Sequence, residues 1–353
     1  KTNRLGHDTA GEFPPCLGSH CYHATVRRTS AAERIKIKHS PRNGALCDLA
    51  VCWLNGYDSS LETKTAPEKA LIATITIRIG PMSNHFEGLG KTWLTLLNDP
   101  EKEVPAVVMQ VMKEGKTRDC WQRKDSKEET MVLAWPVETG FRAGVTVHGN
   151  AGEQLRPVST YPLLEGAPND MTVNETYLWQ NETEGEVSAT CNEGANPLWF
   201  YSPFLFRDRE NLTPGVRHTF LIAGLAYGLR RALLDEMTIT EGVEYERYVA
   251  EWLAQNPGKT RLDVPQLTVD LRGARIVVPG DVASEYQIRV PVTSVEEMHI
   301  QNEKIYMLIV EFGLNTPNPL CFPLYAPERV CKIVPQAGDE IDAIIWLQGR
   351  IID

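Results

Sequence analysis

The chain has 353 residues, of which 42% are hydrophobic and 23% are charged. This composition is typical of a folded globular protein and excludes collagen, coiled coil or disorder as a description of the whole chain. Lys and Arg number 36 against 46 Asp and Glu, a formal charge of −10, which argues against a general role in binding nucleic acid. A chain of this length is expected to form two domains.

No segment has the character of a membrane span or an export signal. The longest apolar run, residues 220–229, contains two glycines and has half of the roughly 20 residues that a spanning helix needs. The first thirty residues lack a signal-peptide core, although a processed N-terminus stays open. Several of the eight cysteines lie in apolar runs, as buried free thiols do. We therefore expect a soluble, cytoplasmic protein without a membrane partner.

Residues 1–40 form an irregular basic arm. They contain seven basic residues and three acidic ones, a formal charge of +4 that leaves −14 for the remainder, and they hold four of the eight histidines. Gly, Pro, Ser and Thr are interspersed without an apolar period, which indicates irregular structure. This arm is the one part of the chain that we expect to be able to contact nucleic acid.

Residues 41–165 have the pattern of a mixed α/β domain. Alternation over 71–79 predicts a strand with one buried face, and short strands are expected at 131–135 and 144–148. A helix is expected over 105–114, with Pro105 in its first turn, a stripe that includes Val111 and Met112, and Gly115 after its end.

The segment 157–206 contains no Lys or Arg but seven acidic residues, and it is rich in Pro, Gly, Asn and Thr from 160 to 196. Such a shift in composition indicates a boundary between domains, which we place between residues 165 and 166. Its glutamates, including Glu184 and Glu186, are expected on a solvated interdomain surface.

Residues 166–353 are expected to form a larger β-rich domain. Strands are predicted at 197–206, 217–229, 266–271, 275–278, 285–292, 304–312, 320–325 and 341–352. One inserted helix is predicted at about 240–256, capped by Thr240. The last hundred residues are compatible with an OB-like barrel or a sandwich, and no internal repeat is visible. The fold class is therefore α+β.

The basic arm holds a candidate zinc site. Four groups of the kind that zinc prefers lie within eight residues: Cys16, His20, Cys21 and His23. Cys47 and Cys52 repeat the spacing of the first two cysteines and could complete the site, but the apolar run around them lacks the turn residues of a metal knuckle. The alternative is a loosely ordered arm with free thiols and no cofactor.

The segment Gly88-Leu-Gly90-Lys91-Thr92 is similar to the end of a phosphate-binding loop. The full motif needs a glycine where this chain has His85, so that backbone N–H groups can wrap the phosphates. An ordinary strand-to-helix turn is the preferred interpretation.

Cys120 is a candidate nucleophile. It lies between Arg118 and Arg123, a basic setting that could lower the pKa of the thiol, and His85, His148 or His218 could act as its base. No local motif of a serine hydrolase, a zinc protease or an EF-hand is present. A surface thiol beside a solvated charge run is the alternative.

An aromatic cluster is the candidate partner-binding surface. It lies within the segment 198–206 and includes Trp199, Phe200, Tyr201 and Phe204. Such side chains can anchor an interface, but aromatic residues at both parities are also typical of a strand buried on both faces.

These observations favour a non-enzymatic binding protein that recognises a protein or peptide partner through its β-rich domain. The alternative is an enzyme with a site at the domain interface, using a cysteine nucleophile or a metal held by the N-terminal Cys/His cluster.

Overall fold

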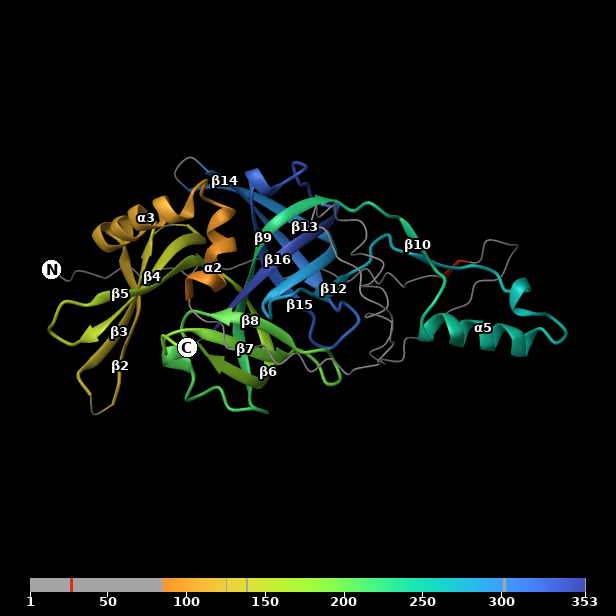
Figure 1. Ribbon diagram of the computed structural model, residues 1–353, viewed down its shortest axis with the longest axis horizontal. Coiled ribbons are helices and arrows are strands. Elements are labelled where there is room, and N and C mark those ends of the chain that lie inside the picture. The colour runs from red at the N-terminus through yellow and green to blue at the C-terminus, as the bar shows by residue number, and fades with distance from the viewer. Residues whose placement is uncertain (1–25, 28–84, 125, 138, 301–302, 353) are drawn as a thin grey trace, which may run out of the picture.

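A computed structural model describes residues 26–27, 85–124, 126–137, 139–300 and 303–352. Their strands form three sheets, of nine, four and three strands. Figure 1 shows the nine-stranded sheet at the centre, the four-stranded sheet and helix α3 at one end, and helix α5 at the other. The described part of the protein is therefore mostly β, with one large sheet. The strand predicted at 71–79 and most of the basic arm lie outside the described residues.

The small sheet is an antiparallel meander. Its strands are β2 (Lys116–Gln122), β3 (Glu128–Trp135), β4 (Phe141–Asn150) and β5 (Arg156–Leu164). Helix α3 (Pro100–Glu114) covers one face, where Val111 packs on Val145 and Val147. The other face turns toward the large sheet, and helix α2 (His85–Leu94) contacts both β5 of the small sheet and β9 of the large one.

Helix α3 starts earlier than predicted. It begins at Pro100, where a proline suits the first turn, and Glu101 and Glu103 favour the positive end of the helix. Met112 is 41% exposed, so its place in the buried stripe was predicted wrongly. The helix ends as predicted at Gly115, where an added Cβ would lie 2.4 Å from the carbonyl oxygen of Val111.

The large sheet closes into two rings. Its strands are β6 (Ala167–Leu178), β7 (Gly185–Thr190), β8 (Leu198–Ser202), β9 (Arg217–Arg231), β12 (Ile276–Pro279), β13 (Glu285–Ile300), β14 (Glu303–Phe312), β15 (Leu320–Pro327) and β16 (Glu340–Ile351). The pairings of β6 with β9 and of β13 with β16 close the rings β6-β7-β8-β16-β9 and β13-β14-β15-β9-β16. Strands β9 and β16 belong to both rings.

The two rings are related by an internal repeat in which β6–β9 correspond to β13–β16. Every pairing has its counterpart: β8 runs parallel to β16, and β15 runs parallel to β9. Even the irregularity in β6 after Val173 recurs in β13 after Val292. The expectation of no internal repeat is therefore wrong at the level of structure.

The pairing of single residues across the strands shows the same correspondence. Tyr201 is paired with Gln348 in the first ring, and the equivalent Tyr325 is paired with Leu225 in the second. A glutamine in one place and a leucine in the other illustrate why the repeat is hidden in the sequence. The fifth strand of each ring comes from the other unit of the repeat, so the last hundred residues do not form a self-contained unit.

Two of the four hydrophobic clusters of the described residues hold most of the core. The larger one fills the rings, with Phe200, Phe220 and Leu324 among its members. The second one lies between the sheets and joins Val132 and Tyr161 of the small sheet to residues of the large sheet such as Trp346. The chain passes from one sheet to the other between β5 and β6, where the domain boundary is predicted.

The third sheet and helix α5 project from the large sheet (Figure 1). The sheet consists of β1 (Val26–Arg27), β11 (Leu267–Asp270) and β10 (Glu236–Ile239). Helix α5 (Val243–Gln255) confirms the inserted helix, but its N-cap is Gly242, with φ of 96°, and not Thr240. Short helical turns are α4 (Leu205–Asp208), η1 (Arg261–Asp263) and η2 (Glu328–Val330).

Each strand predicted beyond residue 210 corresponds to an observed strand, as do those at 131–135 and 144–148. The predicted strand at 197–206 is shorter, because α4 begins at Leu205. Six strands were not predicted: β1, β2, β5, β6, β7 and β10.

The acidic segment is the largest correction to the sequence-based picture. It supplies β6 and β7 to the first ring, and Glu184 and Glu186 are 0% and 2% exposed. They do not lie on a solvated surface. Buried carboxylates require hydrogen-bond donors, and here most of the donors come from distant segments, which local composition does not reveal.

Candidate functional site

Three arginines from three strands converge on one carboxylate where the two sheets meet. Glu165 follows β5, and its Oε2 lies 2.8 Å from Nη1 of Arg142 on β4 and 3.3 Å from Nη2 of Arg118 on β2. Its Oε1 lies 3.4 Å from Nη2 of Arg350 on β16. We call Arg118, Arg142, Arg350 and Glu165 the arginine cluster.

The cluster holds Glu165 in its charged form. Burial by itself would raise the pKa of this carboxyl, but the hydrogen bond from Arg142 and the charges of Arg350, Arg142 and Arg118 outweigh burial and lower the pKa. Three guanidinium groups against one carboxylate leave two positive charges in excess. The cluster is therefore locally basic within an acidic chain.

The ring of Phe204 packs against the arginine cluster. The guanidinium carbon of Arg350 lies 5.7 Å from the centre of its ring, and that of Arg207 lies 5.4 Å away, both within reach of a cation–π interaction. Arg207 in turn forms ion pairs with Asp119 and Asp208. Arg207 and its two acidic partners carry one negative charge in excess, so the cluster and these neighbours together have a formal charge of +1.

The side chains of Arg118 and Arg350 are 33% and 25% exposed, while that of Arg142 is 9% exposed. The adjoining cavity has a volume of about 40 Å³, which accommodates water but not a ligand. The Nε of Arg142 is buried and has no hydrogen-bond partner among the described residues. The part of the cluster that solvent reaches is therefore formed mainly by Arg118 and Arg350.

A second charged cluster occupies the equivalent place in the other ring. When the two irregular strands are aligned, Glu165 corresponds to Ser284, which precedes β13. Ser284 donates a hydrogen bond of 3.1 Å to Glu186, and Lys91 of α2 lies 3.1 Å from the carboxylate of Glu285. Burial raises the pKa of Glu186 to about 7; the Ser284 hydrogen bond lowers it in part, and Glu285 raises it.

A buried polar network joins the sheets between these clusters. Glu184 accepts hydrogen bonds from Ser159 of β5, at 2.5 Å, and from the hydroxyl of Tyr201. Asn181 donates a third hydrogen bond of 2.8 Å. Networks of this kind fix how two layers pack, because a displaced carboxylate would remain buried and unpaired.

Cys120 and His148 do not share a site. Cys120 pairs with Met131, which pairs with Val147, whereas His148 pairs with the neighbouring Thr130. Neighbouring residues of a strand point to opposite faces, so the thiol and the imidazole lie on opposite faces of the small sheet. His85 is the first residue of α2, and its side chain lies outside the described part.

The basic sequence around Cys120 does not lower the pKa of its thiol. Burial raises the pKa, and the hydrogen bond to Glu129, with an Sγ–Oε1 distance of 3.2 Å, raises it further, as do the charges of Glu129 and Asp119. The fold places carboxylates beside the sulfur and directs the neighbouring basic side chains elsewhere. A nucleophilic role is therefore opposed by the surroundings of this thiol.

The aromatic candidates are mostly core residues. Phe200 and Tyr201 are both buried, on opposite faces of β8 and in different hydrophobic clusters, which confirms the interpretation of a strand buried on both faces. Phe204 is also buried, and Trp199 is half-buried. Of the four, Phe204 is the one in contact with the arginine cluster.

The phosphate-loop interpretation is excluded by the local structure. Gly88 to Thr92 lie inside α2, where Thr92 donates a 2.6 Å hydrogen bond to the carbonyl of Leu89. Backbone N–H groups inside a helix are not free to wrap phosphates.

Cys16, His20, Cys21 and His23 lie outside the described residues, as do Cys47 and Cys52. Within the part of the chain that the structure describes, no group of three or more His, Cys, Asp or Glu side chains is placed to hold a metal ion. In the same part, no helix has both the length and the apolar character needed to cross a membrane.

Sequence reasoning missed the members of the arginine cluster as site residues. Arg142 is the single Lys, Arg, Asp or Glu of its strand, and Glu165 follows an apolar run. The strand of Arg350 holds two acidic residues as well. A lone charge in an apolar strand is a usable signal, because it requires a partner when the strand is buried. Comparison of the chain with protein-family models, with curated proteins and with solved structures found no match.

Proposed function

We propose that this chain is a non-enzymatic binding protein that recognises an acidic segment of a protein or peptide partner at the arginine cluster. The observation that carries the proposal is the convergence of Arg118, Arg142 and Arg350 on the single carboxylate of Glu165. Guanidinium groups bind carboxylates in this geometry, and arginines are enriched among the residues that dominate protein interfaces.

The charge of the rest of the chain favours a short acidic segment over nucleic acid. Beyond residue 40 the chain carries a formal charge of −14, and a long polyanion would have to lie along this acidic body. One or two carboxylates can contact the accessible Arg118 and Arg350 without lying along the acidic body, and so without its electrostatic repulsion.

We also propose two domains that meet between residues 165 and 166, the second built of two OB-like rings that share β9 and β16, in a cytoplasmic protein. The change of sheet between β5 and β6 supports the boundary, and rings of five strands have the strand number of an OB-fold barrel. The free thiols of Cys120, Cys191 and Cys331 support a reducing compartment.

The enzymatic alternative now depends on the N-terminal cluster of Cys16, His20, Cys21 and His23. The structure gives Cys120 no catalytic partner among the described residues, and no specific observation favours a reaction at the arginine cluster. Binding is therefore the function that the described geometry supports best.

The test is fluorescence anisotropy with a fluorescein-labelled hexaglutamate peptide and the full chain. We expect saturable binding that is weakened about tenfold, or about 1.4 kcal/mol, in each of Arg118→Met and Arg350→Met. Arg217→Met is the matched control, because Arg217 forms an exposed ion pair with Asp170 elsewhere on the surface.

Labelled hexalysine and oligothymidine serve as competing probes. Stronger binding of either one, or equal affinity for hexaglutamate in all four proteins, would show that the arginine cluster is not an acidic-peptide site.

A further inference from the structure

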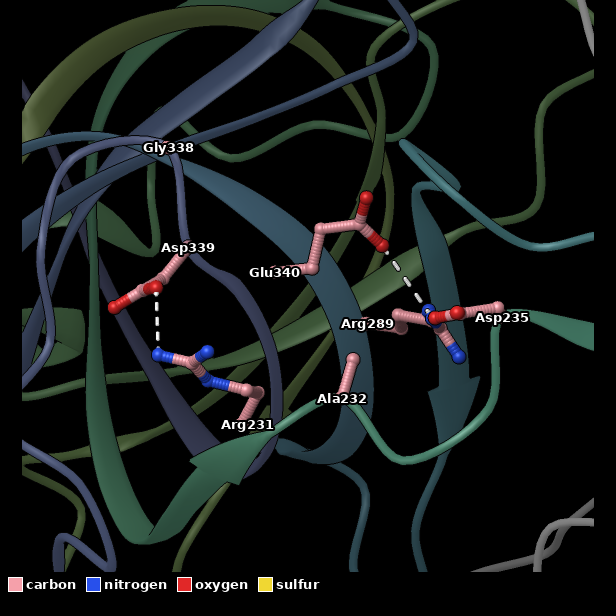
Figure 2. A pocket seen from close by; sticks show the side chains of 7 residues that line it. All are labelled: Arg231, Ala232, Asp235, Arg289, Gly338, Asp339 and Glu340. Atoms are coloured by element: carbon pink, nitrogen blue, oxygen red, sulfur yellow. Dashed lines mark hydrogen bonds and ion pairs between the residues drawn. The ribbon is translucent and has the colours of Figure 1, made fainter.

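A second cavity, of about 210 Å³, lies at the ends of β9 and β16 and shares no residue with the arginine cluster. Its charged lining consists of Arg231, Asp235, Arg289, Asp339 and Glu340. Figure 2 shows the Arg231–Asp339 pair on one side and the Arg289–Glu340 pair on the other. The volume is below the 300 Å³ or so of pockets for drug-sized ligands, so any ligand here is a small one.

Arg289 is an incompletely matched charge in this cavity. Its side chain is 1% exposed, and its Nη2 lies 3.4 Å from Oε2 of Glu340. Its Nε is buried and has no hydrogen-bond partner among the described residues. A guanidinium has five N–H donors, and leaving them unmatched in a buried place is costly. The cavity therefore offers a fixed donor to an acceptor atom that enters it.

The carboxylates of the lining are matched to different degrees. Asp339 is held by Arg231, at 3.2 Å, and by the backbone N–H of Gln336, at 2.9 Å. Glu340 accepts a hydrogen bond of 2.7 Å from the backbone N–H of Gly273 in addition to its pair with Arg289.

The carboxylate of Asp235, in contrast, is exposed and makes no hydrogen bond or ion pair within the described part of the chain. The nearby charge of Arg272, which lies outside the lining, acts on it. With the Arg231–Asp339 and Arg289–Glu340 pairs each neutral, Asp235 leaves the lining with one negative charge in excess. The cavity thus combines an N–H donor without a partner at Arg289 with an accessible carboxylate at Asp235.

We infer that this cavity binds a small zwitterion, a free amino acid, with its carboxylate at Arg289 and its ammonium group at Asp235. A simple anion would leave Asp235 unmatched beside it, and a simple cation would leave the Nε of Arg289 unmatched. A ligand that carries both charges satisfies both groups, and the volume of the cavity suits a molecule of that size.

The experiment is isothermal titration calorimetry of the full chain with each of the twenty common L-amino acids. Any amino acid that binds is then compared with the amine and the acid that each keep one of its two charges, as ethylamine and propionate do for alanine. We expect binding of at least one amino acid and affinities at least about tenfold weaker for its two single-charge counterparts.

Two substitutions in the lining complete the test. Asp235→Asn changes an exposed side chain and is expected to weaken binding at least about tenfold, without loss of fold by circular dichroism. Arg289→Met should abolish binding, and Arg217→Met is the matched control because Arg217 pairs with Asp170 outside the lining.

The inference is overturned if no amino acid binds, which would mean that water alone fills the cavity. It is equally overturned if a single-charge counterpart or phosphate binds as tightly as the amino acid, or if Asp235→Asn binds as tightly as the unmodified chain. If Arg289→Met fails to fold, the result for Asp235→Asn still decides the test, because that substitution leaves the buried arginine in place.

Discussion

Arg350 on the last strand reaches back to Glu165, 185 residues earlier, with its Nη2 3.4 Å from Oε1 of the carboxylate. This ion pair joins the large sheet to the segment that leaves the small sheet. Gln348, two residues before Arg350, makes a similar connection by accepting a hydrogen bond from the N–H of Leu164 and donating one to the carbonyl of Pro162. Strand β16 therefore closes both rings and also holds the small sheet in place.

Glu165→Gln should lower the stability of the protein at neutral pH. The substitution removes a carboxylate that receives three guanidinium groups, and hydrogen bonds to charged groups are worth about 2 kcal/mol. The folded pKa of Glu165 lies below its usual value, so its contribution is present above the unfolded pKa and is lost as the pH falls through the folded pKa.

Urea unfolding at neutral and acidic pH checks this prediction, with the exposed Glu153→Gln as the control. An equal loss of stability at both pH values would contradict the charged state assigned to Glu165.

The raised pKa of Glu186 predicts the opposite dependence of stability on pH. Burial raises its folded pKa to about 7 from an ordinary value of 4.5, so the folded chain binds more protons than the unfolded chain between these values. Stability therefore falls as the pH rises through this window, by up to about 3 kcal/mol from this group.

Glu186→Gln should remove this contribution to the pH dependence of stability. The stability of the variant, compared with that of the unmodified chain, should therefore rise between pH 5 and pH 8. Urea midpoints at several pH values provide the measurement, and Glu193→Gln is the exposed control. A slope that matches that of the unmodified chain would rule out the raised pKa.

Cys120 should react slowly with iodoacetamide for an exposed thiol. Its hydrogen bond to Glu129 and the nearby carboxylates disfavour the thiolate, which is the reactive form. Glu129→Gln should therefore increase the alkylation rate severalfold, as measured by mass spectrometry of the peptide that contains Cys120. Glu128→Gln is the control, since Glu128 pairs with Arg123. Equal alkylation rates in the unmodified chain and the two variants would contradict the raised pKa of the Cys120 thiol.

The exchange of strands between rings predicts that neither half folds alone. A chain divided after Pro257, beyond the end of α5, separates β6–β9 from β13–β16. Each ring then lacks a strand, β16 in the first and β9 in the second. We expect the two fragments to copurify when they are expressed together. A stably folded fragment of residues 258–353, with dispersed amide resonances, would contradict the shared rings.

Strands with a regular pattern were predictable from the sequence. The alternation of Ile341, Ala343, Ile345 and Leu347 indicates one buried face, and all four are buried in the ring core. The opposite face is buried as well, with Trp346 in the cluster between the sheets. Aromatic residues at both parities around Phe200 and Tyr201 correctly indicated burial on both faces. In each case the information lies within one segment.

Features that depend on pairing between distant segments were not predictable. The surroundings of Cys120 are set by the register of β2 with β3, which places Glu129 beside the sulfur. The arginine cluster takes its members from β2, β4, β16 and the turn after β5. The repeat is hidden because equivalent positions carry different chemistry, such as Glu186 in β7 and Met307 in β14.

The most direct test of the proposed site is the affinity of Glu165→Gln for hexaglutamate, measured by anisotropy beside the unmodified chain. If the partner's carboxylate takes the place of Glu165, removal of this internal competitor should tighten binding severalfold, even though the protein becomes less stable. Unchanged or weaker binding by a folded Glu165→Gln protein would contradict the account.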